Sequence, residues 1–436
     1  MSSLKTFAQQ ILASVEALEA IRAQAGPASA NSVFRMPEPE EERATDEIMA
    51  AATSLLSEVR SPMDLLVETC TGQYTTACMC FVNEYDIADI INEAGPKGLH
   101  IKLIGEKIGA DGNKVGRILR YLAVRRIFAE LEPNVFGNNK NSSFLLKGKS
   151  VKEMLADPLA KYDEGQFAAA VGIFADEAFR ASTFIPQFIK DPGEYSSPFN
   201  MAIKDNTDMF SWFNKPENAA RGRRFAAGWK GFGNMLPAED MVAAFDFKAL
   251  KPGSTVVDVG SNVGIVTMHL AKTFPDLHYV MQDLEWVIKE EAPKYWQEKF
   301  PEALTDGRVE FQVHDFNKTN PVVADVYFMR QILHDWPDDV ALRILKGVRA
   351  TAKPTTKLLV FDMIVPHLCA PTPESADAPK FNYSPEMLTM GDMHMMTMQG
   401  GCERTHEQFV ELGNATGWKL ESVKPGPLAA LVYTPV

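Results

Sequence analysis

Cysteine is scarce in this sequence, with five residues among 436. Cys78 and Cys80 lie close together, but no second pair follows at the spacing of a zinc site, and the other cysteines are isolated. We therefore expect neither a disulfide framework nor a metal centre. So few cysteines favour a protein of a reducing compartment, and we expect a cytoplasmic location.

Long apolar runs and basic charge are also lacking. No uninterrupted apolar stretch reaches about 18 residues, the length of a membrane span. The first residues, Met1–Phe7, lack the basic and apolar regions of a secretion signal. Lys and Arg total 44 against 57 Asp and Glu, which gives a net charge of −13. Binding to a nucleic acid needs a concentrated basic face, so we expect neither a membrane nor a nucleic acid as partner.

The most informative stretch that is present is Val256–Gly264, where an apolar run passes Asp258 and breaks into a turn at Gly260. Helical character resumes at Ile265, so the stretch predicts a strand, a tight turn and a helix. The glycine spacing differs from the G-x-G-x-x-G of dinucleotide sites, and the turn holds no Lys or Arg for a phosphate. Asp258 would repel a phosphate but suits a cation. S-adenosylmethionine, which has a sulfonium and no phosphate, therefore fits this turn better than NAD.

Three further apolar stretches follow, each in the position of a strand. Asp283 and Asp315 end the first two, and the third runs into Arg330 and His334. The carboxyl ends of parallel strands meet at one crevice, which is where doubly wound sheets bind their ligands. We therefore predict an α/β fold with a Rossmann-like sheet and a ligand site lined by these side chains.

Residues 80–150 form a second recognisable unit. Periodicity and apolar runs predict three helices and two strands, at residues 85–91, 100–108, 114–124, 127–130 and 143–146. Three helices and a two-stranded wing make a winged helix. This module often binds DNA through its third helix, but the acidic balance of the chain argues against that function here.

Residues 1–25 carry an amphipathic helical stripe between Leu4 and Ile21. This helix must bury its apolar face, and little sequence lies before the loop that follows it. We therefore expect the stripe to contact a partner subunit rather than its own domain.

These motifs together resemble the class I S-adenosylmethionine-dependent O-methyltransferases of the plant caffeate and fungal secondary-metabolite type. The resemblance rests on the motifs at residues 258–264, 282–284, 314–316, 330–336 and 400–405. It implies a doubly wound methyltransferase sheet, an N-terminal, mainly helical winged-helix dimerisation domain, and a homodimer. The predicted segments are a helical extension, the winged-helix domain, a helical connector lining the acceptor pocket and the S-adenosylmethionine-binding domain, at residues 1–60, 61–155, 156–250 and 251–436.

The resemblance also assigns the catalytic groups. Methyl transfer to a hydroxyl needs a base for the hydroxyl's proton, and histidine titrates in the useful range. His334 follows a strand end and matches the family's catalytic histidine, while Asp362 and Glu403 match the carboxylates that orient its ring. The family usually has glutamate at the position of Asp362, so contact between this shorter side chain and the base stays open. Glu403 also precedes a capping box that begins at Thr405, so a helix-capping role stays open as well.

The cofactor residues follow from the same motifs. Asp283 is expected to accept from the ribose hydroxyls and Asp315 from the adenine amino group, with Phe316 against the ring. Arg330 stands where the family commonly has lysine. The complete expected set is Asp258, Gly260, Asp283, Leu284, Asp315, Phe316, Arg330 and Trp336.

For the acceptor pocket, we expect Met387, Met390 and His394, which share one face of a methionine-rich helix. Core packing is an equally good interpretation of these methionines. The expected function is methyl transfer to a phenolic or N-hydroxy oxygen of a mid-sized aromatic secondary metabolite. The alternative is a relative that binds the same cofactor without methylating, such as a pericyclase or hydroxylase; the intact His334 favours transfer.

Overall fold

The computed structural model describes residues 3–25, 39–234, 238–369, 385–426 and 428–436. The chain separates into two compact units, Met1–Thr75 and Thr76–Val436. The finer boundaries at residues 155 and 250 remain predictions.

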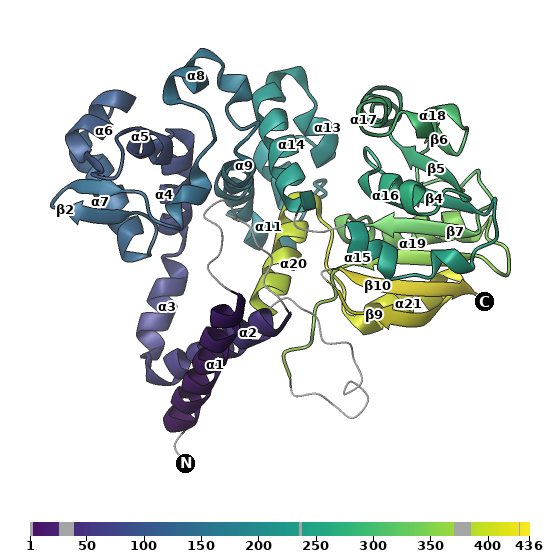
Figure 1. Ribbon diagram of the computed structural model, residues 1–436, viewed down its shortest axis with the longest axis horizontal. Coiled ribbons are helices and arrows are strands. Elements are labelled where there is room, and N and C mark those ends of the chain that lie inside the picture. Colours follow the sequence, from purple (N-terminus) through teal and green to yellow (C-terminus); the bar gives the residue numbers. More distant parts are fainter. Residues whose placement is uncertain (1–2, 26–38, 235–237, 370–384, 427) are drawn as a thin grey trace. The chain divides into compact units, whose positions relative to one another are not determined.

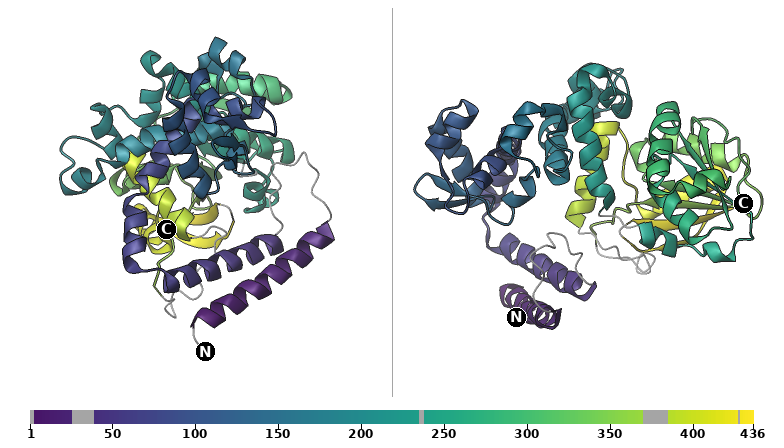
Figure 2. Two further views of the ribbon diagram at one scale, coloured as in Figure 1. Left: turned by 90° about the vertical axis from the view of Figure 1, so that its left-hand side faces the viewer. Right: turned by 45° about the horizontal axis from the view of Figure 1, so that its top comes forward.

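The first unit is a helical hairpin followed by a shorter helix. Helix α1 (Ser3–Ala25) packs along α2 (Pro39–Val59), and α3 (Pro62–Cys70) follows, as Figures 1 and 2 show. Phe7 and Ile11, on the predicted stripe, are partly buried. The stripe therefore has a neighbour in its own chain, α2, which the sequence did not lead us to expect. Helix α3 has no buried residue, and its exposed apolar side chains are Met63, Leu65, Leu66 and Val67.

The boundary between the units falls within α4 (Gln73–Glu84), and the winged helix follows in the second unit. The three predicted helices are present and share a core with β3. A small sheet of order β1-β3-β2 completes the module. The elements are α5 (Ile87–Glu93), β1 (Leu99–His100), α6 (Ile101–Ile108), α7 (Gly112–Val124), β2 (Ala129–Glu132) and β3 (Val135–Gly137).

The strand predicted at residues 143–146 is wrong. Ser142–Leu145 is the 3₁₀ helix η1, because the Asn139 side chain accepts from the backbone N–H groups of Asn141 and Ser142 and closes a turn. The wing instead turns at Asn134, which adopts a left-handed φ of 66°. Local side-chain hydrogen bonds thus overrode the apolar pattern.

A helical segment connects the winged helix to the large sheet. Helix α9 packs against α14, and Glu177, on the π-helical turn η3, pairs with Arg224 of α14. The elements are α8 (Val151–Ala156), α9 (Gln166–Ile173), η3 (Phe174–Ala178), α10 (Phe179–Ser182), α11 (Ile185–Lys190), α12 (Pro198–Ile203), α13 (Met209–Phe213), α14 (Ala219–Asn234) and α15 (Ala238–Ala243).

The large sheet has seven strands in the order β6-β5-β4-β7-β8-β10-β9. Strands β4 to β8 are parallel, whereas β10 runs antiparallel to both neighbours (Figure 1). The chain order reverses between β4 and β7, which opens a crevice at the carboxyl ends of these strands. The strands are β4 (Thr255–Val259), β5 (His278–Asp283), β6 (Val309–Val313), β7 (Val326–Arg330), β8 (Lys357–Asp362), β9 (Trp418–Lys424) and β10 (Ala429–Pro435). This architecture confirms the predicted fold class.

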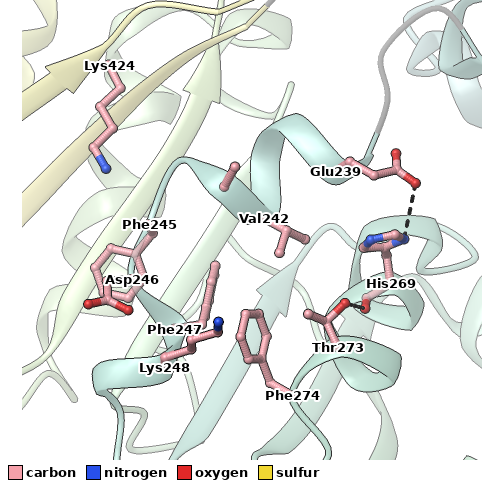
Figure 3. A pocket seen from close by; sticks show the side chains of 11 residues that line it. Glu239, Val242, Phe245, Asp246, Phe247, Lys248, His269, Thr273, Phe274 and Lys424 are labelled. Carbon is pink, nitrogen blue, oxygen red and sulfur yellow. Dashed lines mark hydrogen bonds and ion pairs between the residues drawn. The ribbon is translucent and has the colours of Figure 1, made fainter.

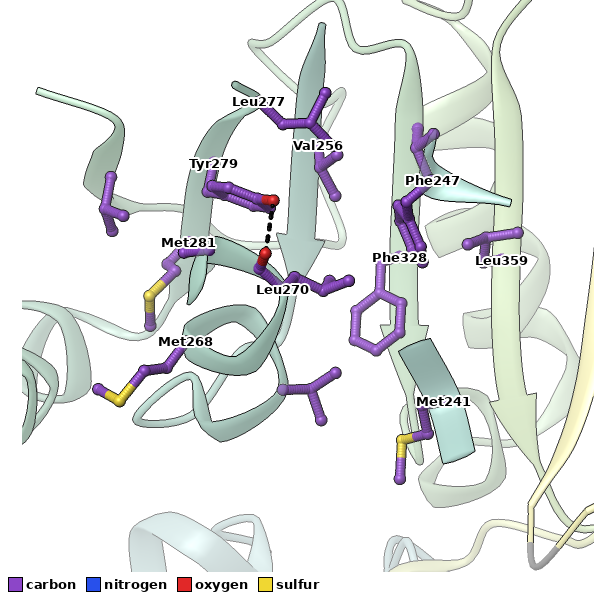
Figure 4. Close-up of a cluster of buried hydrophobic side chains, with 14 of the residues drawn as sticks. Met241, Phe247, Val256, Met268, Leu270, Leu277, Tyr279, Met281, Phe328 and Leu359 are labelled. Carbon is purple, nitrogen blue, oxygen red and sulfur yellow. Dashed lines mark hydrogen bonds between the residues drawn. The ribbon is translucent and has the colours of Figure 1, made fainter. Parts of the chain in front are cut away.

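Both faces of the sheet are covered by helices, which explains why its strands read as continuous apolar runs. Alternate residues point to opposite faces: Val256 and Phe328 join one core (Figure 4), while Val257 and Tyr327 join the other. The covering helices are α15, α16 (Ile265–Thr273) and α17 (Ala292–Lys299) on the first face, and α19 (Asp338–Arg349) and α21 (His406–Thr416) on the second.

Helix α20 (Pro385–Gln399) leaves the sheet and packs against α12 of the connector. It also contacts η7 (Leu333–Asp335), the 3₁₀ turn after β7. Within the ranges that the structure describes, no helix has both the length and the apolar character of a membrane span.

Candidate active site

The glycine turn after β4 has the backbone that its sequence predicts. Gly260 and Gly264 have φ values of 73° and 75°, and Asn262 takes the left-handed region at 51°. A Cβ on Gly264 would lie 2.2 Å from the Met281 methyl, and the φ of 75° strains any residue with a side chain, so the position favours glycine. The Asn262 carboxamide accepts from the Val263 N–H at 2.7 Å, which stabilises the unusual conformation. The turn therefore brings the start of α16 close to the end of β5.

Asp283, at the end of β5, is held in place by two backbone donors. Its two carboxylate oxygens accept from the N–H groups of Asn262 and Leu284, each at 2.7 Å. Burial raises the pKa of Asp283, and these two bonds act in the opposite direction. The Leu284 side chain is exposed. Asp283 is thus oriented before any ligand arrives, which suits a hydrogen-bond acceptor for a diol.

Asp258 lies deeper than the sequence suggested. Its side chain is buried and accepts from the Thr267 hydroxyl. Burial raises its pKa to about 7, and Asp283 and Arg330 act on it with opposite signs. Asp258 therefore lies beneath the turn, where it ties β4 to α16.

Arg330, Asp315 and an aromatic pair lie beyond the turn, at or after the carboxyl ends of β7 and β6. Burial lowers the pKa of Arg330 at the end of β7, and its Nε has no hydrogen-bond partner among the described residues. Asp315 is exposed after β6. The Phe316 and Trp336 rings meet nearly edge to face, with centroids 5.7 Å apart. A buried guanidinium N–H with no partner fits a ligand carboxylate, such as that of an amino acid.

His334 occupies the turn η7 and is 3% exposed. Its Nδ1 lies 2.8 Å from Glu403 Oε1, and its Nε2 lies 3.3 Å from Asp335 Oδ1. Burial alone would lower the pKa of His334, but Asp335 and Glu403 together raise it to about 10. Gln331, three residues earlier, is held at a φ of 51°. The predicted base and one of its two predicted carboxylates are thus in direct contact.

A residue that the sequence did not single out clamps this turn. The fully buried Arg404 donates to the carbonyl groups of Leu333 and Trp336 at 2.7 and 2.8 Å, and it pairs with Asp338 at 2.9 Å. The Cys402 N–H donates to the His334 carbonyl at 2.9 Å. The only sequence signal for Arg404 was its place in the motif at residues 400–405. This loop therefore fixes both the position of the imidazole and that of its carboxylate.

Asp362, the third predicted catalytic group, makes no such contact. It ends β8 with 0% exposure, and neither of its carboxylate oxygens has a hydrogen-bond partner among the described residues. Burial raises its pKa to about 7, while the charge of His334 acts in the opposite direction. The charge of His334 thus acts on the pKa of Asp362, although no hydrogen bond joins the two side chains.

The predicted acceptor residues on α20 divide into two environments. Met387 and Met390 are 47% and 56% exposed. His394 is partly buried, and its ring meets that of Phe174 at a centroid distance of 4.9 Å. Burial lowers the pKa of His394 to about 4, so this imidazole is neutral. His394 thus contacts an aromatic side chain of the π-helical turn η3.

A separate cavity of about 510 Å³ lies beside α15 and α16 (Figure 3). Phe245, Phe247 and Phe274 form its apolar part, and His269 faces Glu239 at its edge. None of the predicted site residues lines it. The candidate active site is therefore the crevice and not this cavity.

A seven-stranded sheet of this order, with a glycine turn after β4 and an acid at the end of β5, is the arrangement expected of an S-adenosylmethionine-dependent methyltransferase. The chain belongs to the O-methyltransferase family: the family's O-methyltransferase domain matches residues 198–419, and the O-methyltransferase dimerisation domain matches residues 67–148. This confirms the resemblance drawn from the motifs.

Curated relatives are fungal O-methyltransferases. An O-methyltransferase of Armillaria gallica is 35% identical over 399 residues, covering 86% of this chain and 84% of the relative. The 4-O-methyltransferase 1 of Phanerochaete chrysosporium is 30% identical, covering 97% and 96%. A crystal structure of OxaC in complex with sinefungin and meleagrin superposes with a TM-score of 0.70 at 19% identity, covering 100% of this chain and 99% of that chain, and shows the same fold. The chain is thus an S-adenosylmethionine-dependent O-methyltransferase of secondary metabolism.

Proposed function

We propose that this enzyme methylates a phenolic or N-hydroxy oxygen of a mid-sized aromatic secondary metabolite, with His334 as the general base. The observation that carries the proposal is the placement of His334 at the end of β7, buried and held by Glu403 through Nδ1. That hydrogen bond engages Nδ1, so Nε2, which lies 3.3 Å from Asp335 Oδ1, is the ring nitrogen that would take the acceptor's proton.

The crevice offers suitable groups for S-adenosylmethionine. Asp283 would accept from the ribose hydroxyls, since two backbone bonds already orient its oxygens. The unpartnered Nε of Arg330 suits the amino-acid carboxylate, and Phe316 and Asp315 suit the adenine. When bound, S-adenosylmethionine supplies a methyl group from its sulfonium and leaves as S-adenosylhomocysteine.

The protein's part in the reaction is to orient the acceptor oxygen and to remove its proton. A phenol has a pKa of about 10. The free-energy cost of the proton transfer is therefore small when the base has a comparable proton affinity. The neighbouring carboxylates outweigh burial and raise the pKa of His334, which makes it a stronger base towards such an acceptor. The raised pKa also means that His334 must release its own proton before the acceptor binds productively.

Two further features belong to the proposal. The matched dimerisation domain and the exposed apolar side chains of α3 support a homodimer. The scarcity of cysteine supports a cytoplasmic location.

The test is a transfer assay over a panel of phenols and N-hydroxy indoles with S-adenosylmethionine, read by mass spectrometry. A methyltransferase adds one methyl group to an acceptor and releases S-adenosylhomocysteine in equal amount. A pericyclase would return a product of unchanged mass, and a hydroxylase would add oxygen. Retention of the methyl group on the cofactor throughout the panel, with either of those products formed, would refute the proposal.

A further inference from the structure

Three buried carboxylates surround one imidazole at the end of β7. Glu403 and Asp335 lie 2.8 and 3.3 Å from the two ring nitrogens of His334. Asp362 is the third, and it is the most deeply buried, with 0% exposure against 6% for Glu403. One imidazolium therefore faces three potential negative charges.

Among the described residues, Gln399 hydrogen-bonds Asp335, but no donor reaches Asp362. Both ring nitrogens of His334 face other carboxylates. The guanidinium of Arg404 is engaged with two backbone carbonyl groups and Asp338. Both oxygens of Asp362 consequently lack a donor among the described residues. Burying an ionised carboxylate without a donor costs far more free energy than burying a neutral carboxylic acid.

We propose that Asp362 is carried as a neutral carboxylic acid in the resting protein and is a positioning residue that sets the base strength of His334 without touching the reacting atoms. The inference rests on the proposed function only in that His334 is taken as the general base. The protonation of Asp362 follows from its own surroundings.

The charged and titratable groups around Asp362 come from three elements. His334 and Asp335 face it from η7, and Glu403 and Arg404 face it from the loop after α20. Tyr433 faces it from β10, whose Ala429 is the register partner of Asp362. With Asp362 neutral, His334 is held by two negative charges instead of three. Ionisation of Asp362 would add the third and make His334 keep its proton more firmly.

The first experiment measures stability, so it needs no acceptor. In the unfolded chain Asp362 releases its proton near pH 4, whereas burial raises its pKa in the folded protein to about 7. Below about pH 4 both states hold the proton; as the pH rises to about 7 only the folded state does, so the folded state loses stability over that window. Asp362→Asn cannot titrate. The ratio of folded to unfolded protein for this variant, relative to that of the wild type, should therefore rise by up to about tenfold for each pH unit and level off above about pH 7.

Asp325→Asn is the matched control. Asp325 is a partnered carboxylate, with Lys353 at 2.9 Å and the Thr255 N–H at 2.9 Å, and its pKa is lowered by these groups despite partial burial. Its contribution is complete above about pH 4 and is lost as the pH falls from there through its lowered folded pKa. The difference between this variant and the wild type should thus stay flat from about pH 5 to pH 8.

A flat or falling stability difference for Asp362→Asn over the same range would overturn the proposal, because Asp362 would then be ionised. If the asparagine variant does not fold, Asp362→Ala gives the same slope, since it cannot titrate either. The readout is the slope of the stability difference against pH, and a loss of stability that is the same at every pH does not affect this slope.

The second experiment uses an acceptor found in the transfer assay. The ratio of kcat/KM for Asp362→Asn to that of the wild type should rise with pH between about 6 and 8, by about tenfold if one charge shifts the His334 equilibrium by that factor. A ratio that is constant or falls would show that Asp362 acts on His334 as a carboxylate or only through structure. If no acceptor is methylated, the proposed function fails while the stability slopes still decide the state of Asp362.

Discussion

Replacing Gly401 by alanine tests how tightly the loop at residues 400–404 encloses the turn that carries His334. A Cβ on Gly401 would lie 2.1 Å from the His334 carbonyl oxygen and 2.5 Å from the Asp335 carbonyl carbon. Ordinary van der Waals contact begins at 3.4 Å. The obstructing atoms are backbone, so they cannot move aside by a change of rotamer. The substitution must push η7 and the loop apart by more than 1 Å.

The expected cost follows from that displacement. Forcing an additional carbon into a packed site costs about 1–3 kcal/mol. The hydrogen bond from the Cys402 N–H to the His334 carbonyl, at 2.9 Å, is lost with it, which costs about 0.5–1.5 kcal/mol. Together these losses come to about 1.5–4.5 kcal/mol, a large part of the 5–15 kcal/mol by which domains are typically stable, as an order-of-magnitude guide.

Gly391→Ala is the control, because it makes the same chemical change in open space. Among the residues that the structure describes, its Cβ would meet only the Met363 sulfur, at 3.8 Å, and Gly391 lies inside α20. Alanine should therefore stabilise the helix there by about 0.5–1 kcal/mol. Urea denaturation followed by tryptophan fluorescence measures both variants. Equal denaturation midpoints would refute the close packing of the loop on η7.

Three further predictions concern the cofactor, the base and assembly. Asp283→Ala should weaken binding of S-adenosylhomocysteine by about 1.5–3 kcal/mol; calorimetry that finds unchanged affinity would remove Asp283 from the cofactor site. His334→Ala should lower turnover by about 10²–10⁴-fold with little effect on cofactor affinity. That loss should shrink as the assay pH approaches the acceptor's own pKa, and a variant with full turnover at neutral pH would exclude a general base at His334. Light scattering should return twice the chain mass of 48.3 kDa, and a mass of one chain at micromolar concentration would contradict the homodimer.

Much of the fold could be predicted from the sequence because it depends on neighbours along the chain. The apolar runs and the glycines at 260 and 264 specify β4, its turn and α16, since strand, left-handed turn and helix are local choices. The acids that end the strands could be placed at one crevice because parallel strands share a carboxyl edge. The prediction of a strand failed at residues 143–146, where hydrogen bonds to the Asn139 side chain stabilise a 3₁₀ turn although most of these residues are apolar.

The state of the site was decided by the tertiary structure. The sequence indicated His334, Glu403 and Asp362 as one group, but only the fold shows that two of them are bonded and that Asp362 is buried without a donor. The sequence also does not indicate that Arg404 donates to the carbonyl groups of Leu333 and Trp336. Hydrogen bonds and burial of this kind join residues some 70 positions apart, and neither residue type nor local spacing contains that information. The chain's own pattern thus determined which residues end the strands, and packing determined how deeply each is buried and which donors reach it.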